Sequence, residues 1–547
     1  MTHLINAQEN VVSEALDGFG LLQPNVRRLA GRNVVVRADQ AVTEANRSTV
    51  PVALISGGGS GHEPAHAGYV ADGMLAAAVA GEIFSSPSVD AVLDAIRAVT
   101  GDAGALLIVK SYTGDRLNFG LAAEIARSEG LDVEVVVVGE DAALGDSDSH
   151  AGRRGLAGTV YVHKIAGAAA RSGASLREVA ELARSVAARV RTFGVGASDV
   201  QVPGAAAEGR LTEGEVELGL GIHGEAGIEK AAFTNAAALM DEVSDRLVRD
   251  LGDTNGAPCA VLLGNAGGTS VLEMGVLARE AHRALTERGV RVERFAQGPV
   301  MTSLSTRGFS LSVLPLEDGW IERLDEPTES LAWPSHAGAP DHAEPLPVPS
   351  EREVEDLGDP DDGAAARIDA VCAAILEAEG ELTRLDQVVG DGDLGQALAR
   401  GAKAWQREPV RGDAAAMLRE WSTRIRRDVG GTSGPLYAVG LLAASEAVAE
   451  GKTWAEAFRA GVDAVMELGG ARPGEKTMVD ALDPAADAAS GGLAAAVEAA
   501  RTGVERTRHE TASKGRASYL GERAKGEPDP GAVAVVVWLE ALQGAGR

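Results

Sequence analysis

Short β-branched runs alternate with amphipathic stretches over residues 34 to 320. The pattern predicts strands at 34–36, 52–55, 106–109 and 133–138, and helices at 89–99 and 176–188. Alternation of this kind is typical of layered α/β folds.

The pattern changes after residue 363, where Ala- and Leu-rich segments have helical spacing. Helices are predicted at 364–381, 395–406, 414–427, 436–450, 455–468 and 533–542. These segments predict an all-α bundle of roughly 185 residues. Seven prolines among acidic and small residues separate the two patterns between 326 and 363, which is typical of an extended linker.

Charge and composition narrow the possible partners. The 547 residues include 51 basic and 80 acidic ones, a net charge of -29 that should repel nucleic acid and anionic membranes. Aromatic residues make up only 3%, too few for a row of base-stacking platforms. The first residues lack the pattern of a secretory signal, and no apolar run reaches about 18 residues. We expect a cytoplasmic protein without a nucleic-acid or membrane partner.

A glycine-rich stretch, residues 57–64 (GGGSGHEP), follows the apolar run 52–55 and is predicted to turn into a helix. Its glycines allow backbone amides to approach a small polar ligand. A dinucleotide fingerprint would need a third glycine at His62 or Glu63, and a Walker A loop would need Gly-Lys-Ser/Thr at 62–64. The stretch matches neither phosphate loop, and a plain tight turn between strand and helix is an alternative.

Three carboxylates, Asp386, Asp391 and Asp393, lie within eight residues between two predicted helices. A calcium loop of the EF-hand type would need a glutamate where Ala402 stands. Three hard oxygen ligands suit magnesium with open positions for phosphate oxygens. The alternative is a solvated acidic turn in which Asp391 caps the next helix.

Other segments are weaker signals when taken singly. Lys110 and Asp115 follow a predicted strand, where α/β sheets place ligand groups, although an ion pair at the strand end would look the same. His223 lies between glycines with few bulky neighbours in the sequence, which also suits a surface or capping role. In the helical half, hydroxyls, amides and charges that could contact a nucleotide occur at 430–434, 474–480, 515–523 and 529–531.

Taken together, these segments resemble the single-chain, ATP-dependent dihydroxyacetone kinase family. The resemblance rests on residues 57–68, 81–87, 110–115, 152–155, 221–225, 390–393, 430–436, 476–482 and 515–531. It implies an α/β substrate-binding part at 1–330, with subdomains at about 1–187 and 188–330. A linker at 331–362 and an all-α helical-barrel ATP-binding domain at 363–547 follow, and the chain is expected to form a homodimer.

The resemblance also implies roles for residues of the first part. His223 would hold the carbonyl of a short hydroxyketone as a covalent hemiaminal. Asp115 would accept the proton of the attacking hydroxyl, and His62 would hydrogen-bond the substrate or act as an acid. The implied positioning residues are Gly59, Ser86 and Lys110.

In the helical part, the resemblance implies that Asp386, Asp391 and Asp393 bind two Mg²⁺ ions that bridge the phosphates of ATP. Positioning and charge neutralisation then suffice without a Walker lysine. Leu394 stands where the family usually has a polar residue, His or Thr. The pair Ala397-Leu398 stands where the family usually has Asn-Met. The positions that match ATP contacts are Leu394, Gly395, Gln396, Ala397, Thr432, Ser433, Gly469, Met478, Arg516, Asp529, Pro530 and Gly531.

The expected reaction is ATP-dependent phosphorylation of the terminal hydroxyl of dihydroxyacetone or of a related hydroxy-carbonyl, such as glyceraldehyde or erythrulose. One alternative is a kinase specific for a four-carbon ketose. Another is a non-catalytic regulator that binds a hydroxyketone, which would need no metal site.

Overall fold

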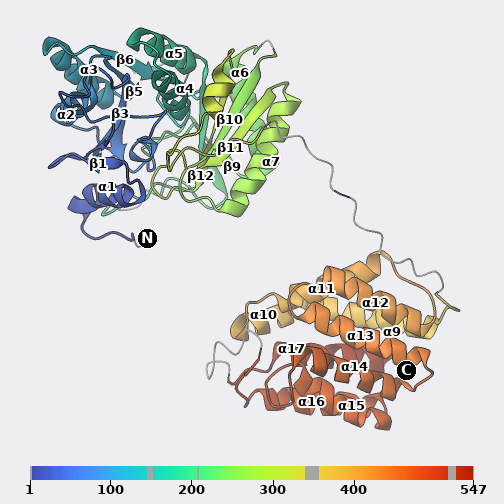
Figure 1. Ribbon diagram of the computed structural model, residues 1–547. Coiled ribbons are helices and arrows are strands. Elements are labelled where there is room, and N and C mark those ends of the chain that lie inside the picture. The colour runs from blue at the N-terminus through green and yellow to red at the C-terminus, as the bar shows by residue number, and fades with distance from the viewer. Residues whose placement is uncertain are drawn as a thin grey trace. The chain divides into compact units, whose positions relative to one another are not determined.

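The chain divides into two compact units, residues 1–345 and 346–547 (Figure 1). The computed structural model describes residues 3–144, 152–205, 209–254, 256–338, 346, 357–514 and 525–545. Within these ranges, no helix is long and apolar enough to cross a membrane.

The first unit begins with a six-stranded sheet in the order β1-β2-β4-β3-β5-β6. The strands β4, β3, β5 and β6 are parallel, and β1 and β2 add an antiparallel edge. The four strands predicted in this region are present as β2, β3, β5 and β6. The bounds are β1 (Val26–Arg28), β2 (Val34–Arg37), β3 (Ala53–Ser60), β4 (Ala77–Ile83), β5 (Ala105–Lys110) and β6 (Val133–Val138).

The glycine-rich stretch does not form the predicted turn into a helix. Strand β3 continues through its glycines to Ser60, and only a short 3-10 helix, η2 (Ala67–Tyr69), follows. A side chain at Gly57 would clash with the carbonyl oxygen of Val79 on β4. The prediction was wrong because these glycines allow close packing of an extended strand, which their composition alone does not distinguish from a turn.

Helices cover both faces of this sheet. On one face lie α2 (Val89–Val99) and α3 (Thr113–Ser128). The other face packs against α1 (Val11–Leu22), α4 (Thr159–Arg171) and α5 (Leu176–Arg189). Every residue of α4 from Thr159 to Ala170 is buried, because this helix also packs in one apolar cluster with Leu262 and Val300 of the second sheet region.

The second sheet has the order β11-β10-β12-β7-β8-β9 and is antiparallel except between β10 and β11. Its outer face is covered by α6 (Ala236–Leu251) and α7 (Val271–Glu287), while α8 (Trp320–Asp325) packs in the cluster around α4. The strands are β7 (Arg191–Gly196), β8 (Glu215–Leu218), β9 (Glu229–Ala232), β10 (Pro258–Asn265), β11 (Arg291–Gly298) and β12 (Gly308–Pro315).

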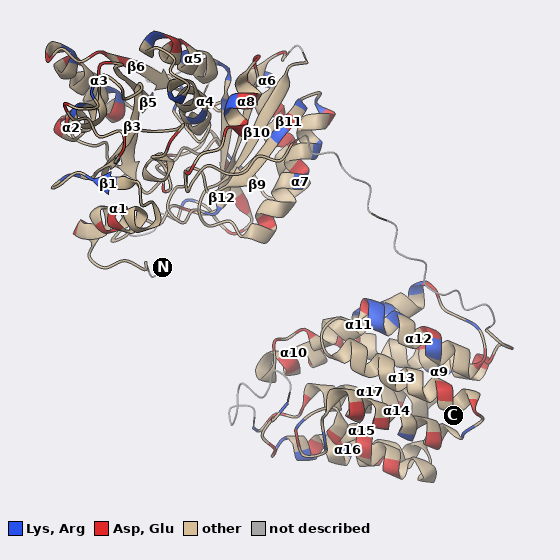
Figure 2. Ribbon diagram, viewed as in Figure 1, with Lys and Arg blue, Asp and Glu red and all other residues tan. Residues whose placement is uncertain are grey.

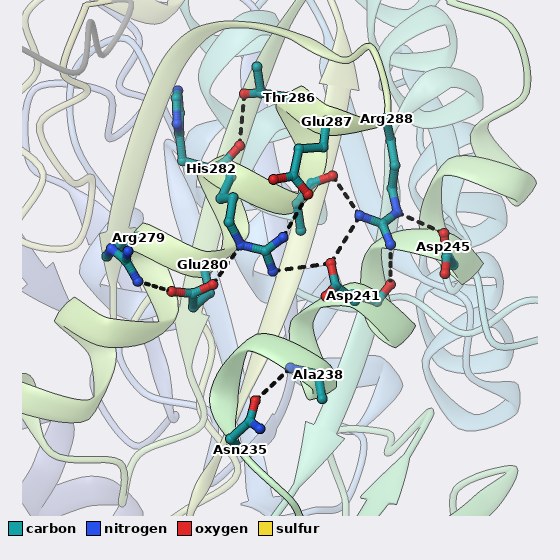
Figure 3. A network of polar contacts seen from close by, with 12 residues as sticks. Asn235, Ala238, Asp241, Asp245, Arg279, Glu280, His282, Thr286, Glu287 and Arg288 are labelled. Carbon is teal, nitrogen blue, oxygen red and sulfur yellow. Dashed lines mark hydrogen bonds and ion pairs between the residues drawn. The ribbon is translucent and has the colours of Figure 1, made fainter.

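Ion pairs join α6 to α7 (Figure 3). Asp241 of α6 accepts hydrogen bonds from Arg283 and Arg288, each at 3.1 Å. Glu280 is buried and is paired with Arg279 and with Arg283. Because a buried carboxylate is costly unless it is paired, these arginines allow Glu280 to remain in the interface.

The beginning of the predicted linker packs onto the first unit. Ala332 and Trp333 contact the apolar cluster around α4, and Ala337 forms a β-bridge with Phe295. The packed chain therefore continues beyond the predicted boundary at residue 330. Residues 339–345 and 347–356 of the predicted linker lie outside the described residues.

The second unit is a helical barrel. Its helices α9, α11, α12, α13, α14, α15, α16 and α17 pack in sequence, and α17 closes the ring against α9. The predicted fold class, an α/β part followed by an all-α barrel, is confirmed. The bounds are α9 (Asp362–Glu377), α10 (Glu379–Val389), α11 (Leu394–Arg407), α12 (Ala414–Asp428), α13 (Ser433–Ala449), α14 (Trp454–Gly469), α15 (Val479–Ala488), α16 (Leu493–Thr507) and α17 (Pro530–Ala545).

The barrel contains a partly open apolar cavity of about 410 Å³, lined by residues such as Ile368, Leu441 and Trp538. Apolar walls cannot balance the charge of phosphate groups. The cavity is therefore distinct from the carboxylate cluster considered below.

Candidate active site

Lys110 and Asp115 meet where β5 ends and α3 begins. The Nζ atom of Lys110 donates to the carbonyl oxygen of Gly57 at 3.0 Å and lies 3.8 Å from Oδ2 of Asp115. Ser86 donates to Oδ1 of Asp115 at 2.5 Å. A side chain at Gly58 would clash with Nζ, so this glycine admits the lysine to the site. The carboxyl ends of parallel strands are where α/β folds place ligand groups.

Both charged side chains are almost completely buried. Burial lowers the pKa of Lys110, while the charges of Asp115 and Glu140 oppose this shift. Asp115 lies in the first turn of α3, where the helix dipole favours a carboxylate. The pair can therefore bind and orient a hydroxyl group.

Gly59 also allows close packing. A Cβ atom at this position would lie 2.7 Å from the backbone nitrogen of Ser85 and 2.8 Å from the Phe84 backbone. Phe84 itself has a positive φ of 57°. Gly59 thus brings β3 against the segment that contains Ser86.

His62 is buried and its orientation is fixed from the second sheet region. Its Nδ1 lies 2.9 Å from the carbonyl oxygen of Thr302, an acceptor only, so Nδ1 carries the proton of the neutral ring. Nε2 then presents a lone pair and has no hydrogen-bond partner among the described residues. Burial lowers the pKa of His62 well below its usual range, and the charges of His223 and Lys110 lower it further.

His223 lies against three rings from distant parts of the first unit. The ring-centroid distances are 4.5 Å to Tyr112, 4.7 Å to His62 and 5.4 Å to Phe84. The sequence around His223 gave no sign of this enclosure. The surrounding bulk comes from segments more than 100 positions earlier.

Glu225 fixes the orientation of His223. Its carboxylate accepts the backbone N–H of His223 at 2.9 Å and lies 3.3 Å from Nδ1 of the same residue. Burial opposes ionisation of Glu225, but the hydrogen bond and charge of His223 and the charge of Arg154 lower its pKa overall. Since Nδ1 faces a carboxylate, it carries the proton and Nε2 presents the lone pair.

In the helical unit, the three aspartates predicted as metal ligands come together. Asp386, Asp391 and Asp393 each have one carboxylate oxygen within 4.8 Å of those of the other two. Asp386 is anchored because its Oδ2 accepts the N–H groups of Asp393 at 2.9 Å and Leu394 at 3.1 Å. Asp391 and Asp393 are exposed. Hard oxygen donors with open positions fit Mg²⁺.

Segments predicted to contact ATP lie beside this cluster. A Cβ atom at Gly431 would lie 4.0 Å from Oδ2 of Asp393, and one at Gly531 would lie 3.4 Å from Cβ of Met478. Asp529 is buried, and burial together with the charges of Asp480 and Asp386 raises its pKa to about 7. The helices α11, α13, α15 and α17 begin in these segments, and helix N-termini favour anions.

The predicted ATP contacts differ in exposure. Gln396, Thr432 and Gly469 are exposed, and Ser433 and Gly531 are half-buried, whereas Gly395, Ala397, Met478, Asp529 and Pro530 are buried. Leu394 places its side chain in the apolar core, and its N–H contacts Asp386. Arg516 lies outside the described residues.

Arg400 was not singled out from the sequence. It is exposed on α11, and its Nη2 lies 3.5 Å from the position of a Cβ atom at Gly430. Arg400 has no ion-pair partner in the described part of the chain. Figure 2 shows Lys and Arg positions in blue along α11 and α12, and Arg400, Lys403 and Arg407 of α11 line a shallow depression.

Comparison with known proteins identifies the family. Residues 17–332 match the Dak1 domain and residues 388–544 match the DAK2 domain. The chain is 39% identical to dihydroxyacetone kinase of Citrobacter freundii, over 98% of each chain. The chain belongs to the dihydroxyacetone kinase family.

A further relative and a solved structure support this assignment. Human triokinase/FMN cyclase is 38% identical over 98% of each chain. The crystal structure of the C. freundii dihydroxyacetone kinase with AMP-PNP and Mg²⁺ matches over 99% of each chain, with 37% identity and a TM-score of 0.69. The predicted family and enzyme class, a kinase, are confirmed.

The sequence did not indicate several residues that shape the site in the α/β unit. The contact of Thr302 with His62 joins positions 240 residues apart, and no local pattern announces a carbonyl oxygen as a partner. Tyr112 and Phe84 lie within the segments 110–115 and 81–87 that carry the resemblance, but no role was predicted for either residue. Glu225 follows His223 by two positions, and this His-Gly-Glu spacing was a usable signal.

Proposed function

We propose that this chain transfers the γ-phosphoryl group of Mg-ATP to the terminal hydroxyl of dihydroxyacetone or of a close three- or four-carbon hydroxy-carbonyl. The proposal is carried by one observation. Glu225 orients His223 so that the Nε2 lone pair of His223 is available, and the Nε2 lone pair of His62 lies beside it. An imidazole prepared in this way can add to a carbonyl group.

In the first step, the Nε2 lone pair of His223 adds to the carbonyl carbon. The π electrons move to the carbonyl oxygen, the Nδ1 proton passes to Glu225, and water carries a proton from Glu225 to that oxygen. A neutral hemiaminal results. His62 Nε2 accepts the hydrogen bond of a substrate hydroxyl, and because this histidine is neutral we assign it the role of an acceptor rather than an acid.

In the second step, Asp115 accepts the proton of the terminal hydroxyl as its oxygen bonds to the γ-phosphorus. The bond from that phosphorus to the bridging oxygen breaks, and its electrons leave with ADP. The Lys110 ammonium orients the hydroxyl, and the hydrogen bond from Ser86 orients Asp115.

The remaining assignments concern the helical unit. Asp386, Asp391 and Asp393 would hold magnesium, which neutralises charge on the transferred phosphoryl group. Binding of two ions is part of this proposal. Gly431 lies near Asp393, and we assign the amides and hydroxyls of the following Thr432 and Ser433 to the phosphates.

The test is an assay of ATP consumption with dihydroxyacetone, glyceraldehyde, D-erythrulose, L-erythrulose and glycerol. We expect turnover on carbonyl substrates and none on glycerol, which has no carbonyl group to capture. Turnover on glycerol alone would refute the hemiaminal. A regulator without activity is disfavoured by the aspartate cluster, and phosphoryl transfer lost in His223→Ala and Asp391→Ala would exclude it.

A further inference from the structure

Lys110 has a hydrogen-bond partner to which the proposed reaction assigns no role. Besides Gly57, its Nζ contacts Nε2 of His66 at 2.8 Å. An ammonium group has three N–H donors, so these two acceptors leave one donor for the side of Asp115. The 3.8 Å separation of Nζ and Oδ2 lets one hydroxyl oxygen lie within hydrogen-bond distance of both.

His66 is in turn held by a second histidine. Nδ1 of His66 lies 3.1 Å from Nε2 of His163. If Lys110 is an ammonium that donates to His66, then His66 carries its proton on Nδ1 and donates it to His163. His163 then carries its proton on Nδ1, which has no hydrogen-bond partner in the part of the protein that the structure describes. The opposite polarity would need a neutral Lys110.

Both histidines are buried, and His163 belongs to the central helix α4. Burial lowers the pKa of His66 well below its usual range, and the charge of Lys110 is the next cause. Burial and then the charge of Lys110 lower the pKa of His163 to about 3. Two neutral rings are therefore available as acceptors at neutral pH.

We propose that His66, oriented by His163, is a positioning residue that directs the Lys110 ammonium toward Asp115 and the accepting hydroxyl of the substrate. The proposal rests on the proposed function of Lys110 and Asp115. It extends the site from the sheet edge into α4, which the sequence motifs did not indicate.

The groups that face Lys110 determine the direction in which its pKa moves when His66 is replaced. Asp115 and Glu140 raise its pKa and burial lowers it, while His66 contributes a neutral acceptor. Loss of that acceptor leaves a buried N–H unsatisfied and lowers the pKa of Lys110 further. Activity that needs the ammonium is then lost at lower pH. The groups around the histidines are His62, beside His66, and Tyr69, whose hydroxyl donates to Val300.

The experiment compares kcat against pH for wild type, His66→Leu, His66→Gln and His163→Phe, with His282→Leu on α7 as the control. In His66→Leu we expect the alkaline limb of the profile to move down by about one pH unit, so that kcat at a pH above both limbs falls about tenfold. Glutamine can accept from Lys110 through Oε1 and donate to His163 through Nε2, so His66→Gln should restore the limb. His163→Phe should give a smaller shift of the same sign.

An unchanged alkaline limb in His66→Leu and His163→Phe would overturn the proposal, even if thermal stability fell, because a purely structural role lowers stability without moving the limb. A second measurement reads the tautomer of His66 in the wild-type protein itself. Nitrogen NMR of ¹⁵N-histidine-labelled wild type, assigned with His66→Gln, should show His66 as the neutral Nδ1–H tautomer that does not titrate down to pH 5. An Nε2–H tautomer would refute the proposal, whereas inactivity of wild type on every carbonyl substrate would refute the proposed function instead.

Discussion

Glu225→Ala tests the orientation of His223 most directly. The substitution removes two hydrogen bonds to a carboxylate, one from the backbone N–H at 2.9 Å and a longer one from Nδ1 at 3.3 Å. A hydrogen bond to a charged group contributes about 1.5–3 kcal/mol. Because the side chain of Glu225 is 34% exposed, solvent screening reduces this contribution, and we take about 1–2 kcal/mol for the pair.

That free energy corresponds to a roughly 5- to 30-fold loss of kcat/KM for dihydroxyacetone. The assay follows ATP consumption at saturating Mg-ATP. Glu225→Gln should lose less, because the amide oxygen still accepts from His223 without the charge. The control is Glu213→Ala, at an exposed position that is not among the residues described for the site. If Glu225→Ala kept its kcat/KM within twofold of wild type, the assignment of Nε2 as nucleophile would be wrong.

Three further predictions concern other parts of the chain. Asp391→Asn should raise the Mg²⁺ concentration needed for half-maximal activity about tenfold, because one charged oxygen ligand is lost; an unchanged Mg²⁺ titration would contradict the metal assignment. Arg400→Gln should raise KM for ATP roughly threefold without changing KM for dihydroxyacetone, since one cation beside Gly430 is removed; equal changes in both constants would argue against a nucleotide role. Arg283→Met should lower the Tm of the first unit, because buried Glu280 loses a partner; calorimetry measures this, and an unchanged Tm would show that Arg279 suffices.

Local pattern was a good guide to the elements. The run at 106–109 became β5, which is buried and apolar as expected of a central parallel strand, and the run at 133–138 became β6, the partly exposed edge strand. The helix α15 was missed, since Pro484 lies inside it and its charged start was read as a ligand segment. The local pattern indicates which secondary structure a segment can form, and tertiary packing determines which one it adopts.

Local sequence patterns predicted the candidate site less well than they predicted the helices and strands. The motif at 386–393 is local, and its three carboxylates do come together. The site in the α/β unit depends on contacts between distant segments, such as His62 with Thr302 and His66 with His163. Neither contact has a periodicity or spacing that a single sequence reveals.

The central helix α4 has a consequence for how the first unit can be divided. It is buried on all sides and shares one apolar cluster with both sheets. A fragment that ends near residue 187 would keep the helix but leave the surface that meets Leu262 and Val300 open to water. The two halves are therefore unsuited to separate expression or to exchange between relatives at that point, and a chimaera would have to carry both sheets with the helix between them.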